Sequence, residues 1–389
     1  MSNVTPRIKS KVGLAQHSRS KHPVQIIKQE IYDFFDTTYR KRGVPIFTQI
    51  DHLSPIVTVA QNFDSVLVPK DHVAREKKDN YYINENYMLR AHTSAHQVDL
   101  LKSGLSAFLC TGDVYRRDTV DRSHYPIFHQ MEGLRVFTQA ELANMLADDT
   151  DFNIRDSSQE RTECQQAGFS TDAMGLLEVN LKRTLEALVK RLFGADVEFR
   201  IVDTTFPFTH PSWEIEVYYR DEWLEVLGCG IIEQRVLENA GITDRIGWAF
   251  GLGLERLAMR LFDVDDIRVF WSEDERVTSQ FEQFDGDYAN FNFLDPKKNI
   301  EPKPFDTAMW IIDGFNEMDF YDMARSCDPD DVIEKIELID VFTHPKTGQT
   351  SHCYRTFYRG LAKGTAFSDV EHIDRAIRER VTEQGLTLR

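Results

Sequence analysis

A strand-rich stretch, Val197 to Gly253, constrains the fold of this chain more than any other feature. Leu176 to Phe193, before it, repeats apolar residues at spacings of three and four, which predicts an amphipathic helix. Leu254 to Phe262, after it, returns to helical spacing. Because several strands follow one another and the helices lie outside them, the pattern predicts an antiparallel sheet in an α+β domain rather than alternating βαβ units.

The C-terminal part of the chain has its own order of elements. Residues 272–304 are charged and aromatic without a period and end in a proline-rich run, which predicts a linker. Beyond it, runs in the order β-α-β-β-α suit a small ferredoxin-like α/β sandwich. We therefore expect a main domain over 22–271 and a second domain over 305–389, which 389 residues are enough to build. The polar, acidic stretch 148–172 predicts a surface insertion.

Composition argues against several classes of protein. No apolar run approaches the roughly 18–20 residues needed to span a membrane. The five cysteines are scattered and never form a C-x-x-C pair, which argues against a disulfide framework or a cysteine zinc site and fits a reducing compartment. A net charge of −17 argues against non-specific binding of polyanions, although a locally basic groove can still dock one RNA.

The first segment, residues 1–21, differs from the rest of the chain. No acidic residue precedes Glu30, whereas basic residues and serines are frequent. This bias is typical of an organellar transit peptide, and equally of a disordered basic arm that contacts RNA. Both interpretations stay open at this point.

A predicted hairpin over residues 112–137 places polar groups of different kinds on one face. Arg116 shares a face of the first strand with Val114 and Asp118, while one face of the second carries Phe128, Gln130, Glu132 and Leu134. The carboxylate could hold an ammonium group, the guanidinium a phosphate and the aromatic ring a purine. That set is what an ATP-dependent amino-acid activator requires. A solvated face with incidental ion pairs is the alternative.

The run from Gly251 to Met259 predicts a turn between a strand and a helix. Gly251 and Gly253 permit a backbone to approach a ligand closely, and Arg256 lies in the first helical turn, where phosphate is favoured. Such turns also occur without any ligand. Neither a P-loop lysine motif nor a G-x-S-x-G elbow is present, so those routes to ATP use or acyl transfer have no support.

Two further pairs of residues allow more than one interpretation. Phe206 and Phe208 could wall an apolar slot or simply belong to a sheet core. His92 and His96 stand four residues apart and could bind a metal if helical, although the glutamate of the metalloprotease pattern is missing. A role for them in a loop or at a helix start is the alternative.

Six ordered motifs resemble the mitochondrial, single-chain phenylalanyl-tRNA synthetases of the class II family. They are HTSAHQ (92–97), GDVYRRD (112–118), HYPIFHQMEG (124–133), FPFTHPS (206–212), WLEVLGCG (223–230) and WAFGLGLERLAM (248–259). The likeness extends from about His22 to the C-terminus and includes HPKTGQTSHCYR (344–355). It implies a class II antiparallel sheet flanked by helices, followed by a ferredoxin-fold anticodon-binding domain.

The resemblance also implies roles for individual residues. Arg116, His124 and Arg256 would be catalytic groups at the phosphates of ATP, with Phe128 stacked on adenine. The ATP side would be completed by Glu225, Gly228 and Gly253. Phenylalanine would be bound by His92, Ser94, Gln97, Gln130, Glu132, Phe206, Phe208 and Ala249, of which Ala249 would close the slot at the para position.

The implied reaction is ATP- and Mg²⁺-dependent formation of phenylalanyl-adenylate and its transfer to the 2′-OH of phenylalanine tRNA in the mitochondrial matrix. No protein metal ligand is implied. Relatives of this type are monomers. Another organelle or the cytoplasm is the alternative location if the basic leader is not a transit peptide. Three other functions compete: an adenylating ligase without tRNA, a non-catalytic tRNA-binding or regulatory protein, and a metal-dependent hydrolase.

Overall fold

The main body of the protein is built on a seven-stranded sheet. The computed structural model describes residues 2–145, 166, 168–219, 221–360 and 367–389. The strand order is β3-β6-β7-β11-β10-β9-β8. These strands are β3 (Thr48–Ile50), β6 (Ala107–Tyr115), β7 (Ile127–Phe137), β8 (Phe199–Phe206), β9 (Thr209–Tyr219), β10 (Glu222–Ile232) and β11 (Ile246–Gly253).

The sheet is antiparallel, as predicted, except at one edge. There β3 runs parallel to β6, and the pairing joins Gln49 to Leu109. The chain between these two strands is long enough for the crossover that a parallel pair needs. The sheet is therefore mixed, with six antiparallel strands and one short parallel strand.

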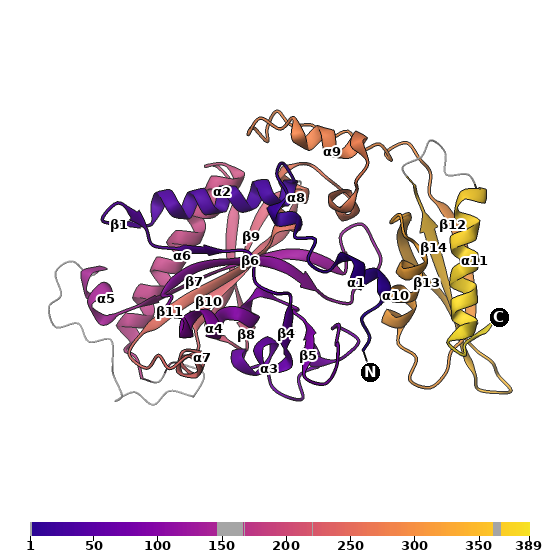
Figure 1. Cartoon of the computed structure of the whole chain (residues 1–389), viewed down its shortest axis with the longest axis horizontal. Coiled ribbons are helices and arrows are strands. Elements are labelled where there is room, and N and C mark those ends of the chain that lie inside the picture. Colours follow the sequence, from indigo (N-terminus) through magenta and orange to yellow (C-terminus); the bar gives the residue numbers. More distant parts are fainter. Residues whose placement is uncertain (1, 146–165, 167, 220, 361–366) are drawn as a thin grey trace.

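Helices cover one face of the sheet and form the largest core. They are α2 (Pro23–Thr38), α6 (Thr171–Phe193) and α8 (Leu254–Leu261), and Figure 1 shows α2 lying along this body. Leu181, Leu185 and Leu188 of α6 are fully buried, which confirms the predicted amphipathic helix. Against the other face pack α3 (Val59–Asn62), α4 (Gln97–Lys102), α7 (Gln234–Asn239) and the pair β4 (Ile56–Thr58) and β5 (Tyr87–Leu89).

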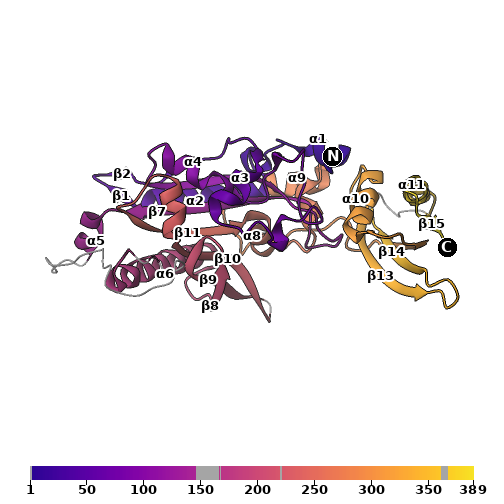
Figure 2. The same cartoon turned by 90° about the horizontal axis from the view of Figure 1, so that it is seen from below.

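The C-terminal part forms a second sheet beside this body, as both Figure 1 and Figure 2 show. Its strands are β12 (Lys303–Trp310), β13 (Ile333–Thr343), β14 (Thr350–Tyr358) and β15 (Thr387–Leu388), in the spatial order β13-β14-β12-β15. Helices α10 (Glu317–Cys327) and α11 (Phe367–Glu383) complete the expected β-α-β-β-α order, to which β15 adds a short last strand. Phe320 and Ile377 join the helices to a separate core.

Two segments differ from their sequence expectations. Residues 2–21, expected as a leader or disordered arm, form α1 (Pro6–Lys11) and η1 (Gln16–Ser18), and Ile8 is 2% exposed. The expected linker 272–304 contains α9 (Glu275–Glu282), whose Phe281 packs edge-on against Phe262. In both segments, apolar side chains pack against residues that are distant in sequence. The predicted insertion 148–172 lies mostly outside the described residues.

Among the described residues, no helix is both long and apolar enough to cross a membrane.

Candidate active site

Two adjoining cavities open on the face of the main sheet that α2, α6 and α8 leave uncovered. The smaller has a volume of about 320 Å³ and the larger about 650 Å³. Both are lined by Arg116, Gln130, Glu225 and Gly251, so they form two compartments of one cleft. Because β7 alternates its side chains, Phe128, Gln130 and Glu132 all point to this face.

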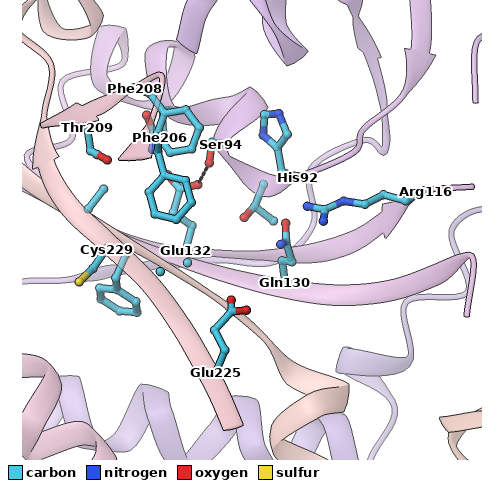
Figure 3. Close-up of a pocket in the computed structure, with 16 residues that line it drawn as sticks. His92, Ser94, Arg116, Gln130, Glu132, Phe206, Phe208, Thr209, Glu225 and Cys229 are labelled. Carbon is cyan, nitrogen blue, oxygen red and sulfur yellow. Dashed lines mark hydrogen bonds between the residues drawn. The ribbon is translucent and has the colours of Figure 1, made fainter. Parts of the chain in front are cut away.

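The smaller cavity contains every residue that the sequence assigned to phenylalanine. These are His92, Ser94, Gln97, Gln130, Glu132, Phe206, Phe208 and Ala249. Figure 3 shows the two phenylalanine rings at one side and Arg116 at the other, with His92 and Gln130 between them. The rings of Phe206 and Phe208 are parallel within 5° and 5.8 Å apart. One end of the cavity is therefore an aromatic slot and the other is polar.

Glu132 is the buried carboxylate of the polar end. It is 2% exposed, and Ser94 Oγ donates a hydrogen bond to its Oε2. Burial raises the pKa of Glu132 to about 7, although the hydrogen bond from Ser94 opposes that rise. Its Oε1 has no hydrogen-bond partner within the part of the chain that the structure describes. A ligand ammonium group would supply both a donor and a compensating charge.

The larger cavity contains most of the residues assigned to ATP. Arg116, His124, Phe128, Glu225, Gly253 and Arg256 line it. The guanidinium of Arg116 lies 5.2 Å from the centre of the Phe128 ring, and its Nε donates to the carbonyl of Ala91 at 2.8 Å. Burial lowers the pKa of Arg116 from its ordinary value, and the nearby Arg256 lowers it further. Two guanidiniums close together form a site for an anion.

Glu225 and His124 border the same compartment. Arg256 Nη1 forms an ion pair with Glu225 Oε2 at 3.3 Å, and both side chains are about half exposed. His124 Nδ1 lies 2.8 Å from Asp121 Oδ2, and this contact raises the pKa of His124 above its ordinary value. The imidazole therefore has a greater tendency to carry charge beside the two arginines.

Gly228 was assigned to the ATP side, and here the structure differs. It lines the smaller cavity and not the larger one. A Cβ at this position would stand 2.8 Å from Cζ of Phe206. Glycine is therefore needed so that the Phe206 ring can lie against β10.

His92 and His96, which the sequence allowed as metal ligands, have different surroundings in the structure. His92 lines the cavity, and burial together with Arg116 lowers its pKa to about 3, so it is neutral. The guanidinium of Arg90 lies 3.0 Å from Nε2 of His96 and also pairs with Asp113. A cation already in contact with His96 disfavours a metal ion there, and the described residues contain no cluster of three potential ligands.

Sequence reasoning missed several residues of this cleft. Thr93, Thr209 and Cys229 line the smaller cavity, and the buried side chain of Arg90 donates through Nε to the carbonyl of Asp113 on β6. Thr93, Thr209 and Cys229 lie inside motifs that carry other site residues, so proximity in sequence could have indicated them. Arg90 precedes the first motif and belongs to no pattern, and its contacts with Leu53 and Asp113, 37 and 23 residues away, could not be inferred from the sequence.

Comparison with known proteins assigns the chain that forms this cleft to a class of protein. The family model described as "tRNA synthetases class II core domain (F)" matches residues 8–154 and 155–281. The mitochondrial phenylalanine–tRNA ligase of Rattus norvegicus is 46% identical over 403 residues, covering 98% of this chain and 85% of the relative. That of Saccharomyces cerevisiae is 35% identical, covering 100% and 92%. A phenylalanine–tRNA ligase alpha subunit of Prochlorococcus marinus is 34% identical, covering 67% of this chain and 66% of the relative.

The chain is thus a class II aminoacyl-tRNA synthetase by its core domain. Within that class it belongs to the phenylalanine–tRNA ligase family, and it resembles the mitochondrial members over nearly all of its length.

Proposed function

We propose that this protein activates L-phenylalanine with ATP and transfers it to the 3′-terminal ribose of phenylalanine tRNA. The observation that carries the proposal is the two-compartment cleft. An aromatic slot ending in Glu132 and Gln130 adjoins a compartment with two guanidiniums, and Arg116 borders both. An amino acid and a nucleotide bound there would bring a carboxylate next to an α-phosphate.

The first step needs positioning and charge stabilisation rather than a protein nucleophile. A carboxylate oxygen of phenylalanine attacks the α-phosphorus, the bond to the β-phosphate oxygen breaks, and pyrophosphate leaves. Arg116 and Arg256 stabilise the negative charge that develops on the phosphate. Ser94, Gln97, Gln130 and Glu132 hold the amino and carboxylate groups, with His92 beside them. Phe206, Phe208 and Ala249 enclose the ring.

On the nucleotide side, Phe128 stacks on adenine, His124 lies near the phosphates and Gly253 allows close approach of the backbone. Glu225, a carboxylate at the wall of both compartments, fits Mg²⁺, which is held through one or two carboxylates and phosphate oxygens. When bound, Mg²⁺ neutralises charge on the phosphates. In the second step, the 2′-OH of the terminal ribose attacks the carbonyl carbon of the adenylate and AMP leaves.

We infer that the C-terminal sheet supplies a surface for the anticodon of the tRNA. Trp310, Phe342 and His344 form a group of ring contacts on it, and the guanidinium of Arg389 lies 4.3 Å from the Phe342 ring centre. Half-buried aromatic rings beside an arginine favour stacking with unpaired bases, although this part is acidic as a whole. The names of the relatives support action in mitochondria. We propose the matrix as the compartment and a monomer as the working form.

Amino-acid-dependent ATP–pyrophosphate exchange tests the proposal. Exchange with phenylalanine alone among the twenty amino acids, followed by charging of phenylalanine tRNA, is the expected result. Exchange without charging would indicate an adenylating ligase that needs no tRNA. Binding of tRNA with no exchange would indicate a non-catalytic protein.

A further inference from the structure

The strand that carries the cleft residues makes a second set of contacts through His129, among them one with Glu255, a residue at the wall of the larger cavity. His129 stands between Phe128 and Gln130, so its ring points to the opposite face of β7. The ring is 1% exposed. Its backbone N–H donates to Glu255 Oε2 at 2.7 Å, and its Nδ1 donates to Glu255 Oε1 at 2.6 Å. One carboxylate therefore accepts two hydrogen bonds from one residue.

This contact joins the two elements that hold the nucleotide. β7 carries Phe128, and Glu255 lies in the first turn of α8, directly before Arg256. Glu255 is 2% exposed, so both hydrogen bonds form away from water, where they are stronger. The distance between the Phe128 ring, on which adenine would stack, and the Arg256 guanidinium therefore depends on the hydrogen bonds between Glu255 and His129.

The N-terminal segment supports the same ring. His17 is 1% exposed, and its ring centre lies 5.1 Å from that of His129. Its Nε2 donates to the carbonyl of Asp51 at 3.0 Å, and burial lowers the pKa of His17 to about 4, so the ring is neutral at pH 7. Trp271 stacks on His129 at 5.9 Å. Two rings and a carboxylate thus restrict His129.

We propose that Glu255 and His129 are positioning residues for the nucleotide half of the active site, and that His17 extends this support from the N-terminal segment. This inference rests on the proposed function, because it assigns Phe128 and Arg256 to ATP. None of the three side chains acts on the reacting atoms. They act through Phe128 and Arg256.

Glu255→Gln tests the central contact. An amide presents one acceptor oxygen and one NH₂ group, so it satisfies only one of the two N–H donors of His129. We expect kcat/KM for ATP in pyrophosphate exchange to fall by up to about 10²-fold, the scale of a displaced catalytic group. The KM for phenylalanine should stay near the wild-type value. A protein that has only lost stability would show a lower melting temperature and fewer active molecules, with both KM values unchanged.

His17→Ala and His22→Ala form a matched pair that keeps the test open if Glu255→Gln fails to fold. Both histidines are buried and bind a backbone carbonyl, but the ring contact of His22 is with Phe270 and not with His129. The KM for ATP should rise in His17→Ala and stay unchanged in His22→Ala. Equal changes in the pair, or unchanged ATP kinetics in both His17→Ala and Glu255→Gln, would overturn the inference. Absence of phenylalanine-dependent exchange in the wild type would instead refute the proposed function.

Discussion

Arg116 enters the cleft directly after β6 and is held there by protein contacts alone. Its Nε is bound to the carbonyl of Ala91, and its guanidinium lies over Phe128. Arg116→Ala removes one donor that faces the developing charge, so adenylate formation should fall by about 10²–10³-fold. The measurement is the rate of phenylalanine-dependent ATP–pyrophosphate exchange.

Arg116→Lys and Arg40→Ala are the controls for that loss. Lysine keeps the charge but not the planar fork, so most of the defect should remain. Arg40 is exposed and its guanidinium donates to backbone oxygens near it, so Arg40→Ala should exchange at the wild-type rate. Near-normal exchange in Arg116→Ala would show that this guanidinium does not serve the phosphate.

Glu132 gives the site a pH dependence. Its pKa rises from 4.5 to about 7 in the free protein, so the folded state binds this proton more tightly than the unfolded state does. The contribution of Glu132 to stability therefore falls as pH rises from about 4.5 to 7. Phenylalanine binding requires the carboxylate, so kcat/KM for phenylalanine should rise with pH through about 7. Glu132→Gln should lose this inflection, and a profile that keeps it would assign the titration to another group.

We propose that Ala249 sets the depth of the aromatic slot. It is 4% exposed and lines the smaller cavity from β11. Ala249→Gly should admit para-chlorophenylalanine, because the methyl group no longer blocks the para position. Tyrosine should remain the poorer substrate, since an unpaired hydroxyl in an apolar site costs about 1–3 kcal/mol. The ratio of kcat/KM values for the analogue and phenylalanine is the measurement, and an unchanged ratio would place Ala249 outside the ring pocket.

At the scale of elements, the sequence predicted those parts whose signal is local. The hairpin of β6 and β7 and the turn from β11 into α8 follow from alternation and helical spacing within short windows. β3 could not be predicted as a parallel edge strand, because its three residues pair with a strand almost 60 positions later. The N-terminal segment has the composition of a leader, yet Gly13 donates to Asp113 and Tyr115, contacts that no local pattern indicates.

Ile8 tests whether the N-terminal segment stabilises the fold. It is 2% exposed and belongs to the main core, whereas Leu14 in the same segment is 52% exposed. Ile8→Ala should lower the free energy of unfolding by about 2–5 kcal/mol, the usual result of emptying a buried aliphatic site. Leu14→Ala should change it by less than about 0.5 kcal/mol. Urea unfolding measures both, and equal values would mean that the segment does not pack in solution.

For the whole molecule, the contact between its two parts depends on buried charges. Arg117 Nε lies 2.7 Å from Asp322 Oδ2, and the hydroxyl of Tyr81 donates to the same carboxylate. Arg325 of α10 donates to the backbone carbonyls of Asp118 and Thr119. These partners lie more than 200 residues apart, so the sequence predicted both parts without any indication of how they meet.

Asp322→Ala should destabilise the protein by up to about 3–5 kcal/mol, because it removes the buried carboxylate that Arg117 and Tyr81 share and leaves Arg117 only the exposed Asp319 as an ion-pair partner. Asp306, which pairs with Arg355 on the exposed sheet face, provides the control. Asp306→Ala should cost less than about 1 kcal/mol. The measurement is the melting temperature of the two variants in thermal unfolding. Similar melting temperatures would mean that the buried pairs contribute no more than surface ones.

The strand β7 also fixes the spacing between two residues of the cleft. Phe128 and Glu132 are four residues apart on it, and a strand advances about 3.3 Å per residue, so their backbone positions are separated by about 13 Å. If the substrates bind as proposed, one continuous strand positions both the purine ring and the amino group. The distance between the two substrates would then be set by backbone geometry before either of them binds.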